Sequence, residues 1–357
     1  MKAIYINSPG QIEIRDMEIP VRKPGEALLK LLYGGICGSD LGSYRGTFAY
    51  FSYPRIPGHE FSAEIVEIDD NNYGLKKGMI VTCNPYFNCG HCYSCRRGIV
   101  NACMDNQTMG CQRDGAFCQY ITMPLDRIYP GKGLSPKVLA AIEPFCISYH
   151  GVQQAHIQPG QKVLVVGAGT IGVLAANAAK IMGAEVYLCD VAQEKLRYAM
   201  DTFGFAGAIL NDRPGALEAA VRQITGAVNI QGNSTACGFD VCIEAVGMPE
   251  TFQNCIDAAA FGGKVVLIGI GKKNLDFNFT LIQKKELQIF GSRNALKRDF
   301  LELIDLVQAG KVDLEKIITH EYKLDNIAQA FADFDRNAGQ MLKVMIDFTD
   351  SSANTQW

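Results

Sequence analysis

The chain has 357 residues, of which 48% are hydrophobic and 20% are charged, and its formal net charge is −3. This length exceeds what one compact core accommodates and predicts two domains of ordinary globular composition. The slight negative charge offers no basic surface to a nucleic acid, so we exclude nucleic acid as a partner.

Thirteen cysteines would predict disulfides in a short secreted chain, but residues 1–5 (MKAIY) show no apolar signal sequence. We therefore expect thiols and metal ligands in a reducing cytoplasm. The apolar run at residues 163–182 approaches the length of a membrane span. Three spaced glycines interrupt that run, so we expect a buried strand, a turn and a helix, and no membrane association.

Short alternating runs of apolar and polar residues occupy the first part of the chain, at residues 2–6, 11–14 and 26–32. Pro9-Gly10 and Pro24-Gly25 separate them as turns. This pattern predicts a β-rich domain of the partly open barrel kind.

Two loops of this domain carry Cys37-Gly38-Ser39-Asp40 and Gly58-His59-Glu60. A thiolate, an imidazole and a carboxylate form a ligand set that zinc takes in catalytic sites, which keep one coordination position open. One cysteine and one histidine are also compatible with an inert core. The metal interpretation therefore depends on the motifs that follow.

The next motif comprises four cysteines, Cys89, Cys92, Cys95 and Cys103. Their spacing, C-x2-C-x2-C-x7-C, predicts a closed tetrahedral zinc site that stabilises a lobe of the fold. Iron–sulfur ligation uses similar spacings and is the main alternative, and disulfides are a second one. His91 lies between the ligands, and we expect it to be exposed rather than bound.

From residue 161 the pattern changes to strands that alternate with helices. Residues 163–166 predict a buried strand, and Gly167-Ala168-Gly169-Thr170-Ile171-Gly172 precedes an alanine-rich helix that ends near Gly183. A second strand at residues 185–189 ends at Asp190. A strand, a G-x-G-x-x-G turn, a helix and a following acid together form the fingerprint of a dinucleotide-binding unit.

The roles of these residues follow from the ligand's chemistry. The glycines permit a tight turn and let the pyrophosphate approach the helix N-terminus. Asp190 would accept hydrogen bonds from the ribose hydroxyls and repel a 2′-phosphate, which favours NAD over NADP. Lys195, one turn into the next helix, is a second candidate for the ribose.

The remaining segments continue the alternation. We expect strands at residues 239–243, 264–269 and 287–290, a helix at 249–260, and one helix followed by a long Gly/Asn/Ser-rich loop within 211–238. Beyond Arg293 we expect a helix, a strand at 317–319, a helix at 324–334 and a strand at 342–346, all belonging to the first domain. Residues 351–356 should form a frayed end.

With these motifs in place, the chain resembles the zinc-dependent medium-chain dehydrogenases over essentially its whole length. The shared features are the Cys37 and His59 motifs, the four cysteines, Glu143-Pro144 and the glycine-rich turn. The resemblance implies an α/β fold with a GroES-like, β-rich catalytic domain at residues 1–148 and 294–357, including a structural zinc lobe at about 83–111. It implies a doubly wound Rossmann domain at residues 149–293 that binds NAD.

The resemblance also implies two zinc ions per chain. Cys37 and His59 would hold the catalytic zinc, with Glu60 and Glu143 as exchangeable or water-mediated ligands, and Ser39 would pass the substrate's proton outward. Zinc would stabilise the alkoxide while hydride moves to the nicotinamide. Many relatives carry a histidine five residues after the zinc-binding cysteine, whereas this chain has Gly42, so the resemblance does not assign the outer part of the proton route.

A glutamate at position 143 and the stretch Tyr44-Arg45-Gly46 resemble the sorbitol, threonine and sugar-acid branch. The leading hypothesis is an NAD-dependent dehydrogenase of a polyol, cyclitol or sugar acid, with L-threonine 3-dehydrogenase as the alternative. A non-catalytic NAD-binding relative is disfavoured because the ligand residues are retained. Arg45 and Arg55 are candidates for gripping an anionic substrate. We further expect a homo-oligomer, either a dimer or a tetramer.

Overall fold

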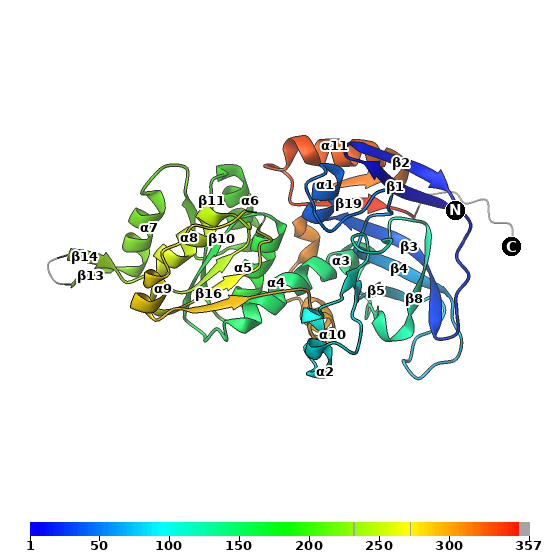
Figure 1. Cartoon of the computed structure of the whole chain (residues 1–357), viewed down its shortest axis with the longest axis horizontal. Coiled ribbons are helices and arrows are strands. Elements are labelled where there is room, and N and C mark those ends of the chain that lie inside the picture. Colours follow the sequence, from blue (N-terminus) through cyan, green and yellow to red (C-terminus); the bar gives the residue numbers. More distant parts are fainter. Residues whose placement is uncertain (231–232, 272, 350–357) are drawn as a thin grey trace. The chain divides into compact units, whose positions relative to one another are not determined.

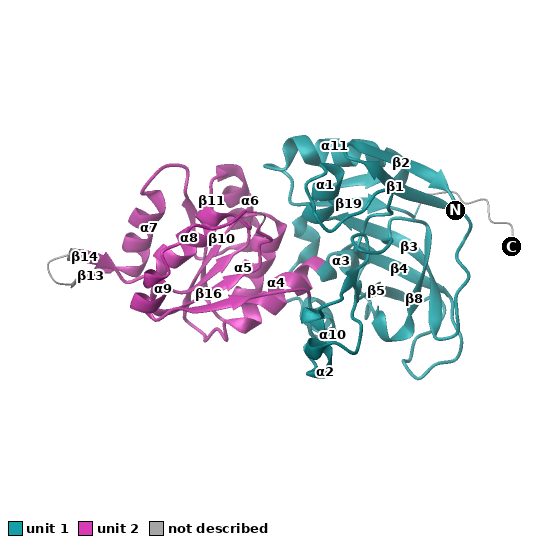
Figure 2. Cartoon of the chain, viewed as in Figure 1, with its two compact units in different colours: residues 1–143, 295–357 teal, residues 144–294 magenta. Residues whose placement is uncertain are grey.

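The computed structural model describes the chain except for residues 231–232, 272 and 350–357, so the expected frayed end at 351–356 lies outside the described residues. The chain forms two compact units (Figure 2). Unit 1 consists of Met1–Glu143 and Ala295–Trp357, and unit 2 of Pro144–Asn294. The first boundary between the units was expected after residue 148. It falls between Glu143 and Pro144, near the start of helix α4 (Ile142–Gln154).

Within the described residues, unit 1 is built around a seven-stranded sheet with the path β18-β19-β3-β4-β5-β9, in which β8 also pairs with β3 (Figure 1). The bounds are β3 (Glu26–Ile36), β4 (Glu60–Glu67), β5 (Ile80–Cys83), β8 (Tyr120–Pro124), β9 (Ile128–Pro130), β18 (Ile318–Lys323) and β19 (Lys343–Asp347). Strand β19 pairs antiparallel with β3, opposing Val344 to Ile36. The C-terminal segment therefore completes the N-terminal sheet, as the sequence predicts.

Shorter elements surround this sheet. Strands β1 (Lys2–Ser8) and β2 (Gln11–Asp16) form a hairpin, and β6 (Tyr86–Phe87) pairs with β7 (Gln107–Thr108). The helices are α1 (Gly38–Tyr44), α2 (Tyr93–Arg96), η1 (Val100–Ala102), η2 (Leu125–Arg127), α3 (Pro136–Ala140), α10 (Lys297–Gln308), η3 (Leu314–Ile317), η4 (Leu324–Asn326) and α11 (Ile327–Asn337). Phenylalanines from distant segments, including Phe61, Phe117 and Phe331, fill the core.

The described residues of unit 2 form a six-stranded parallel sheet in the order β12-β11-β10-β15-β16-β17. The strands are β10 (Lys162–Val166), β11 (Glu185–Asp190), β12 (Gly207–Leu210), β15 (Phe239–Glu244), β16 (Ala259–Leu267) and β17 (Gln288–Gly291). The helices α5 (Thr170–Ile181), α6 (Gln193–Phe203), α7 (Ala216–Thr225), α8 (Pro249–Ala258) and α9 (Thr280–Lys285) connect them. This strand order is that of a doubly wound dinucleotide-binding sheet, so the expected Rossmann domain is confirmed.

Two local expectations in unit 2 were wrong. The segment expected as a loop after α7 contains an antiparallel hairpin, β13 (Ala227–Ile230) and β14 (Asn233–Ala236). Its polar residues hide the apolar alternation that normally indicates a strand. The chain also leaves α8 at Ala258, two residues earlier than expected, and enters β16 directly, because Ala259 adopts an extended backbone with φ −68° and ψ 141°.

None of the helices in the described part of the chain is both long and apolar enough to cross a membrane. The apolar run at residues 163–182 divides into β10, a turn and α5, as expected.

Candidate functional site

The two loops that carry the predicted zinc ligands are joined by Asp40. Strand β3 ends at Ile36 and α1 begins at Gly38, so Cys37 occupies the junction between them. Asp40 Oδ2 accepts a hydrogen bond from Cys37 N at 2.9 Å, and Oδ1 accepts one from Gly58 N at 3.2 Å. One buried carboxylate thus fixes the backbone beside both Cys37 and His59.

The turn before His59 requires glycine. Gly58 has a φ of +96°, in the left-handed region, and a Cβ there would overlap the ring of Phe117. Glycine therefore lets the chain pass Phe117 closely and present His59 immediately before strand β4, which begins at Glu60.

The structure brings Cys37, His59 and Glu60 together, with one ligand atom of each within 4.8 Å of the others. The buried Nδ1 of His59 lies 3.9 Å from Asp40 Oδ1 and has no hydrogen-bond partner among the described residues. Histidines that bind metals commonly direct their second nitrogen at such a carboxylate. This arrangement leaves Nε2 of His59 as the nitrogen available to an ion.

The electrostatics of this group favour a cation. Burial opposes the charged form of His59, but the negative charges of Asp40 and Cys37 outweigh it and hold the pKa of His59 well above its usual value. Burial also raises the pKa of Asp40, although His59 opposes that shift. The group attracts positive charge, which the zinc prediction requires.

Lys343, which the sequence analysis missed, forms a buried ion pair with Glu60. Its Nζ lies 2.8 Å from Oε1 and 2.5 Å from Oε2 of Glu60, and 3.2 Å from the carbonyl oxygen of Ile36. Burial alone would lower the pKa of Lys343, but Glu60 reverses this effect and the pKa is raised. Lys343 begins β19, and only the pairing of β19 with β3 brings it to Glu60.

Glu143 lies outside the group of three ligand atoms. It is buried at the start of α4, and its Oε1 accepts a hydrogen bond from the hydroxyl of Tyr86. Burial raises the pKa of Glu143 to about 7, with smaller effects from the charges of His59 and Glu60. The structure thus separates the two candidate carboxylates: Glu60 joins Cys37 and His59, and Glu143 is held by a phenol.

The predicted relay residue, Ser39, and the glycine at the position of the missing histidine, Gly42, both lie in α1. Ser39 is half-buried, and its carbonyl oxygen accepts a hydrogen bond from Ser43 Oγ at 2.9 Å. The carbonyl of Gly42 accepts hydrogen bonds from Thr47 N at 2.8 Å and from Thr47 Oγ1 at 3.3 Å. A threonine hydroxyl therefore lies beside the glycine that replaces the histidine of many relatives.

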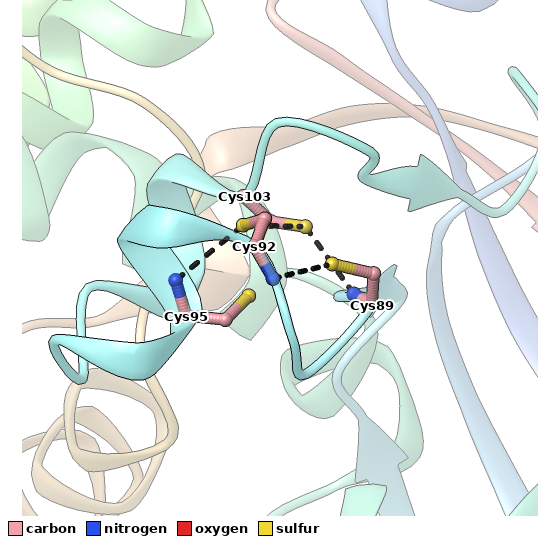
Figure 3. Close-up of side chains that lie close together, drawn as sticks. All are labelled: Cys89, Cys92, Cys95 and Cys103. Atoms are coloured by element: carbon pink, nitrogen blue, oxygen red, sulfur yellow. Dashed lines mark hydrogen bonds between the residues drawn. The ribbon is translucent and has the colours of Figure 1, made fainter.

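The four-cysteine lobe is assembled as predicted (Figure 3). Its sulfur atoms lie within 4.8 Å of one another, and the four side chains converge from the turn before α2, from α2 itself and from the end of η1. Backbone N–H groups of Cys89 and Cys92 donate to Cys103 Sγ at 3.2 Å and Cys89 Sγ at 3.3 Å. Hydrogen bonds from Met104 and Cys95 lower the pKa of Cys92 to about 6.

Burial has the opposite effect on Cys103 and raises its pKa to about 11, so of these two thiols Cys92 is the one predisposed to the thiolate form. N–H···S hydrogen bonds stabilise thiolates, and none of the thirteen cysteines, all of which lie among the described residues, forms a disulfide. His91 is exposed, and its Nδ1 lies 2.9 Å from the carbonyl oxygen of Cys89, so it is placed as expected. The convergence of four sulfurs is the arrangement of a closed tetrahedral site.

The glycine-rich turn joins β10 to α5. Gly167 has a φ of +109°, and a Cβ at Gly172 would overlap the carbonyl oxygen of Gly167. A Cβ at Gly169, which precedes α5, would meet nothing within 4 Å, so the backbone is open there. Thr170 and Ile171 form the first turn of α5, and the backbone N–H groups at a helix N-terminus can bind phosphate.

Asp190 ends β11 and stabilises the same turn. Its Oδ2 accepts a hydrogen bond from Ala168 N at 2.6 Å, and its Oδ1 accepts one from Ala192 N at 2.8 Å. Each carboxylate oxygen retains a second lone pair for a ligand hydroxyl. Lys195 is half-buried in α6, which follows Asp190.

A third loop at this edge of the sheet depends on Glu244, another residue that the sequence analysis did not identify. Its Oε1 accepts hydrogen bonds from Val246 N at 2.9 Å, Gly247 N at 2.8 Å and Thr251 Oγ1 at 2.7 Å. The loop packs against the glycine-rich turn, because a Cβ at Gly167 would lie 2.7 Å from Val246 Cγ2. Strand β15 extends one residue further than expected, to Glu244, and so places this residue at the start of the loop.

Both candidate arginines are engaged at the surface. Arg45 forms an ion pair with Asp335 of α11. Arg55 Nη2 lies 2.5 Å from Ser52 Oγ. These contacts correspond to the alternative interpretation, in which both arginines are surface residues that bind no substrate anion.

Comparisons with known proteins agree with this fold. Residues 23–133 match the family described as alcohol dehydrogenase GroES-like domain, and residues 170–309 match zinc-binding dehydrogenase. An Escherichia coli K12 L-galactonate-5-dehydrogenase is 34% identical over 98% of this chain and 99% of its own length. A Pyrococcus horikoshii L-threonine 3-dehydrogenase is 33% identical over 93% of this chain and 94% of its own.

Among solved structures, an alcohol dehydrogenase from Escherichia coli CFT073 in complex with NADH is similar. It superposes with a TM-score of 0.86 at 29% identity, covering 97% of this chain and 99% of the other. The matched residues include parts of both units. The chain therefore belongs to the zinc-dependent medium-chain dehydrogenase family.

Proposed function

We propose that the protein is an oxidoreductase that uses zinc and NAD to transfer a hydride between the cofactor and a secondary alcohol of a sugar acid or polyol. The observation that carries this proposal is the convergence of Cys37, His59 and Glu60, with the unpaired buried Nδ1 of His59 directed toward Asp40. The NAD assignment is supported by the turn that Asp190 and the glycines build.

Cys37 and His59 would hold the catalytic zinc permanently, and Glu60 would be an exchangeable ligand because Lys343 already engages both of its oxygens. A bound zinc would supply the Lewis acid that polarises the oxygen of the substrate. Cys89, Cys92, Cys95 and Cys103 would hold a second zinc, which stabilises the lobe.

The proton of the substrate hydroxyl would leave through this chain's own groups. Ser39 is the proposed first acceptor because it lies two residues after Cys37 and is partly exposed to solvent. Gly42 has no side chain to extend the route, so we propose that the proton passes from Ser39 to water.

The cofactor preference rests on Asp190. Its carboxylate would accept hydrogen bonds from the ribose hydroxyls, for which Lys195 is a second candidate, and its charge would repel a 2′-phosphate. The wild-type enzyme should therefore have a higher kcat/KM with NAD than with NADP.

The sugar-acid assignment is supported by the relative named L-galactonate-5-dehydrogenase, which aligns over nearly the whole chain. The relatives named L-threonine 3-dehydrogenase keep that activity as the second candidate. A panel of aldonates, sugar alcohols, inositols and L-threonine, assayed with NAD by absorbance of NADH, separates them. A Cys37→Ala control should be inactive with every substrate, and absence of NADH formation by the zinc-loaded wild type would overturn the proposal.

We also propose a cytoplasmic homo-oligomer. The absence of disulfides among the described cysteines supports a reducing compartment. In the described part of unit 2, β17 is an edge strand that pairs with β16, so its outer backbone groups are available to a second copy. Light scattering at micromolar concentration should give a mass of two or four chains, and a monomer would contradict it.

A further inference from the structure

Tyr86 connects two sites that the family motifs treat as separate. It is buried in β6, and its hydroxyl donates a hydrogen bond to Glu143. Three residues later the chain reaches Cys89, the first sulfur of the four-cysteine lobe. The same short strand therefore contacts the candidate catalytic carboxylate and leads into the lobe.

Strand β6 has only two residues, and side chains hold it in place. Arg127 donates from Nη1 to the carbonyl oxygen of Tyr86 and from Nη2 to Asn88 Oδ1 at 3.0 Å. The Arg127 guanidinium also lies 4.4 Å from the centre of the Phe87 ring, and that of Arg113 lies 3.7 Å from it. This clamp fixes the backbone on both sides of Phe87.

Asn88 connects Arg127 to the four-cysteine lobe. Its oxygen accepts the hydrogen bond from Arg127, and its Nδ2 lies 3.8 Å from Cys95 Sγ, within hydrogen-bond range of sulfur. Movement of the lobe would therefore move Asn88, and with it the backbone that carries Tyr86.

We propose that Tyr86 is a positioning residue that orients the Glu143 carboxylate, and that the four-cysteine lobe holds Tyr86 in place through Asn88 and Arg127. With Oε1 engaged by the phenol, Oε2 would be the oxygen that serves the metal site. The lobe thus acts on the reaction as well as on folding. This inference rests on the proposed function, in which Glu143 takes part.

The first test is a double-mutant cycle of Tyr86→Phe with Glu143→Gln. Tyr86→Phe should lower kcat/KM by about tenfold or more, the effect of removing a hydrogen bond to a charged group. In the Glu143→Gln background the same change should have little further effect, because Tyr86 acts through that carboxylate. Additive losses would show that Tyr86 acts independently of Glu143 and would overturn the proposal.

A matched control is Tyr322→Phe. Tyr322 donates to Asp333 Oδ2 at 2.9 Å, so this change removes a phenol–carboxylate hydrogen bond elsewhere in unit 1. It should leave kcat and KM unchanged. An equal kinetic loss in Tyr322→Phe would show that the effect of Tyr86→Phe is general rather than specific to Glu143.

The second test needs no turnover. Zinc release from the loaded protein to a chelator is followed for the wild type, Tyr86→Phe and Asn88→Ala, with two release phases expected for two sites. Both variants should speed release from the Cys37–His59 site, and Tyr86→Phe should leave the lobe phase unchanged. If neither variant alters release from that site, the coupling does not exist. An inactive wild type with altered release in the variants would refute the proposed function alone.

Discussion

Replacing Lys343 with methionine should be strongly destabilising. The amine contacts both oxygens of Glu60, and the two side chains are only 3% and 1% exposed. Methionine approximates the length of the lysine stem, so the chief change is loss of the charge that neutralises a buried carboxylate. Removing one partner of a buried ion pair costs about 3–5 kcal/mol.

Urea unfolding of the protein without zinc at the Cys37–His59 site, followed by circular dichroism, would measure this loss, because a zinc ion there would itself compensate the charge of Glu60. The control is Lys2→Met, because Lys2 pairs with Asp325 at 2.7 Å with 39% and 69% of the side chains exposed. An exposed pair contributes about 1 kcal/mol or less. The double variant Lys343→Met with Glu60→Gln should recover part of the loss, since it removes the stranded charge. Equal losses in Lys343→Met and Lys2→Met would refute this reasoning.

Three further predictions concern the metal lobe and the cofactor. Cys95→Ser should lower the melting temperature and the zinc content from two ions to one by elemental analysis, and two ions at full stability would contradict the lobe assignment. Asp190→Ala should raise KM for NAD and reduce discrimination against NADP, and an unchanged ratio of kcat/KM values would count against the ribose role. Gly172→Ala should weaken NAD binding by more than about tenfold in titration calorimetry, because its Cβ would overlap the Gly167 carbonyl and distort the turn. Unchanged NAD affinity in this variant would show that the turn tolerates a side chain.

The motifs that could be predicted from the sequence are those whose residues lie close together in the chain. The spacing of the four cysteines and the strand–turn–helix pattern around Gly167 are short-range features, so they need no knowledge of the tertiary fold. The alternation of strands and helices in unit 2 is likewise a local pattern, but strand β12 (Gly207–Leu210) and the order of the strands in the sheet were not predicted, because that order depends on tertiary packing. The hairpin of β13 and β14 escaped prediction because Asn229, Ser234 and Thr235 interrupt the apolar alternation that normally indicates a strand.

The residues around the zinc ligands could not be predicted in this way. Lys343 reaches Glu60 only because β19 pairs with β3 in one register. Tyr86 reaches Glu143 across a long sequence separation, with nothing in its own segment to indicate the contact. Asp40 lies inside a recognised motif, but its role appears only when the Gly58 turn folds against it.

Three buried carboxylates around Cys37 and His59 are held by three different donors. Asp40 is held by backbone N–H groups, Glu60 by an ammonium group and Glu143 by a phenol. Loss of the ammonium leaves an uncompensated charge, whereas loss of the phenol removes one neutral donor and leaves the charge balance intact. Lys343→Met should therefore act mainly on the free energy of unfolding, and Tyr86→Phe mainly on kcat/KM. A variant pair with this contrast would separate the part of the site that stabilises the fold from the part that orients a reacting group.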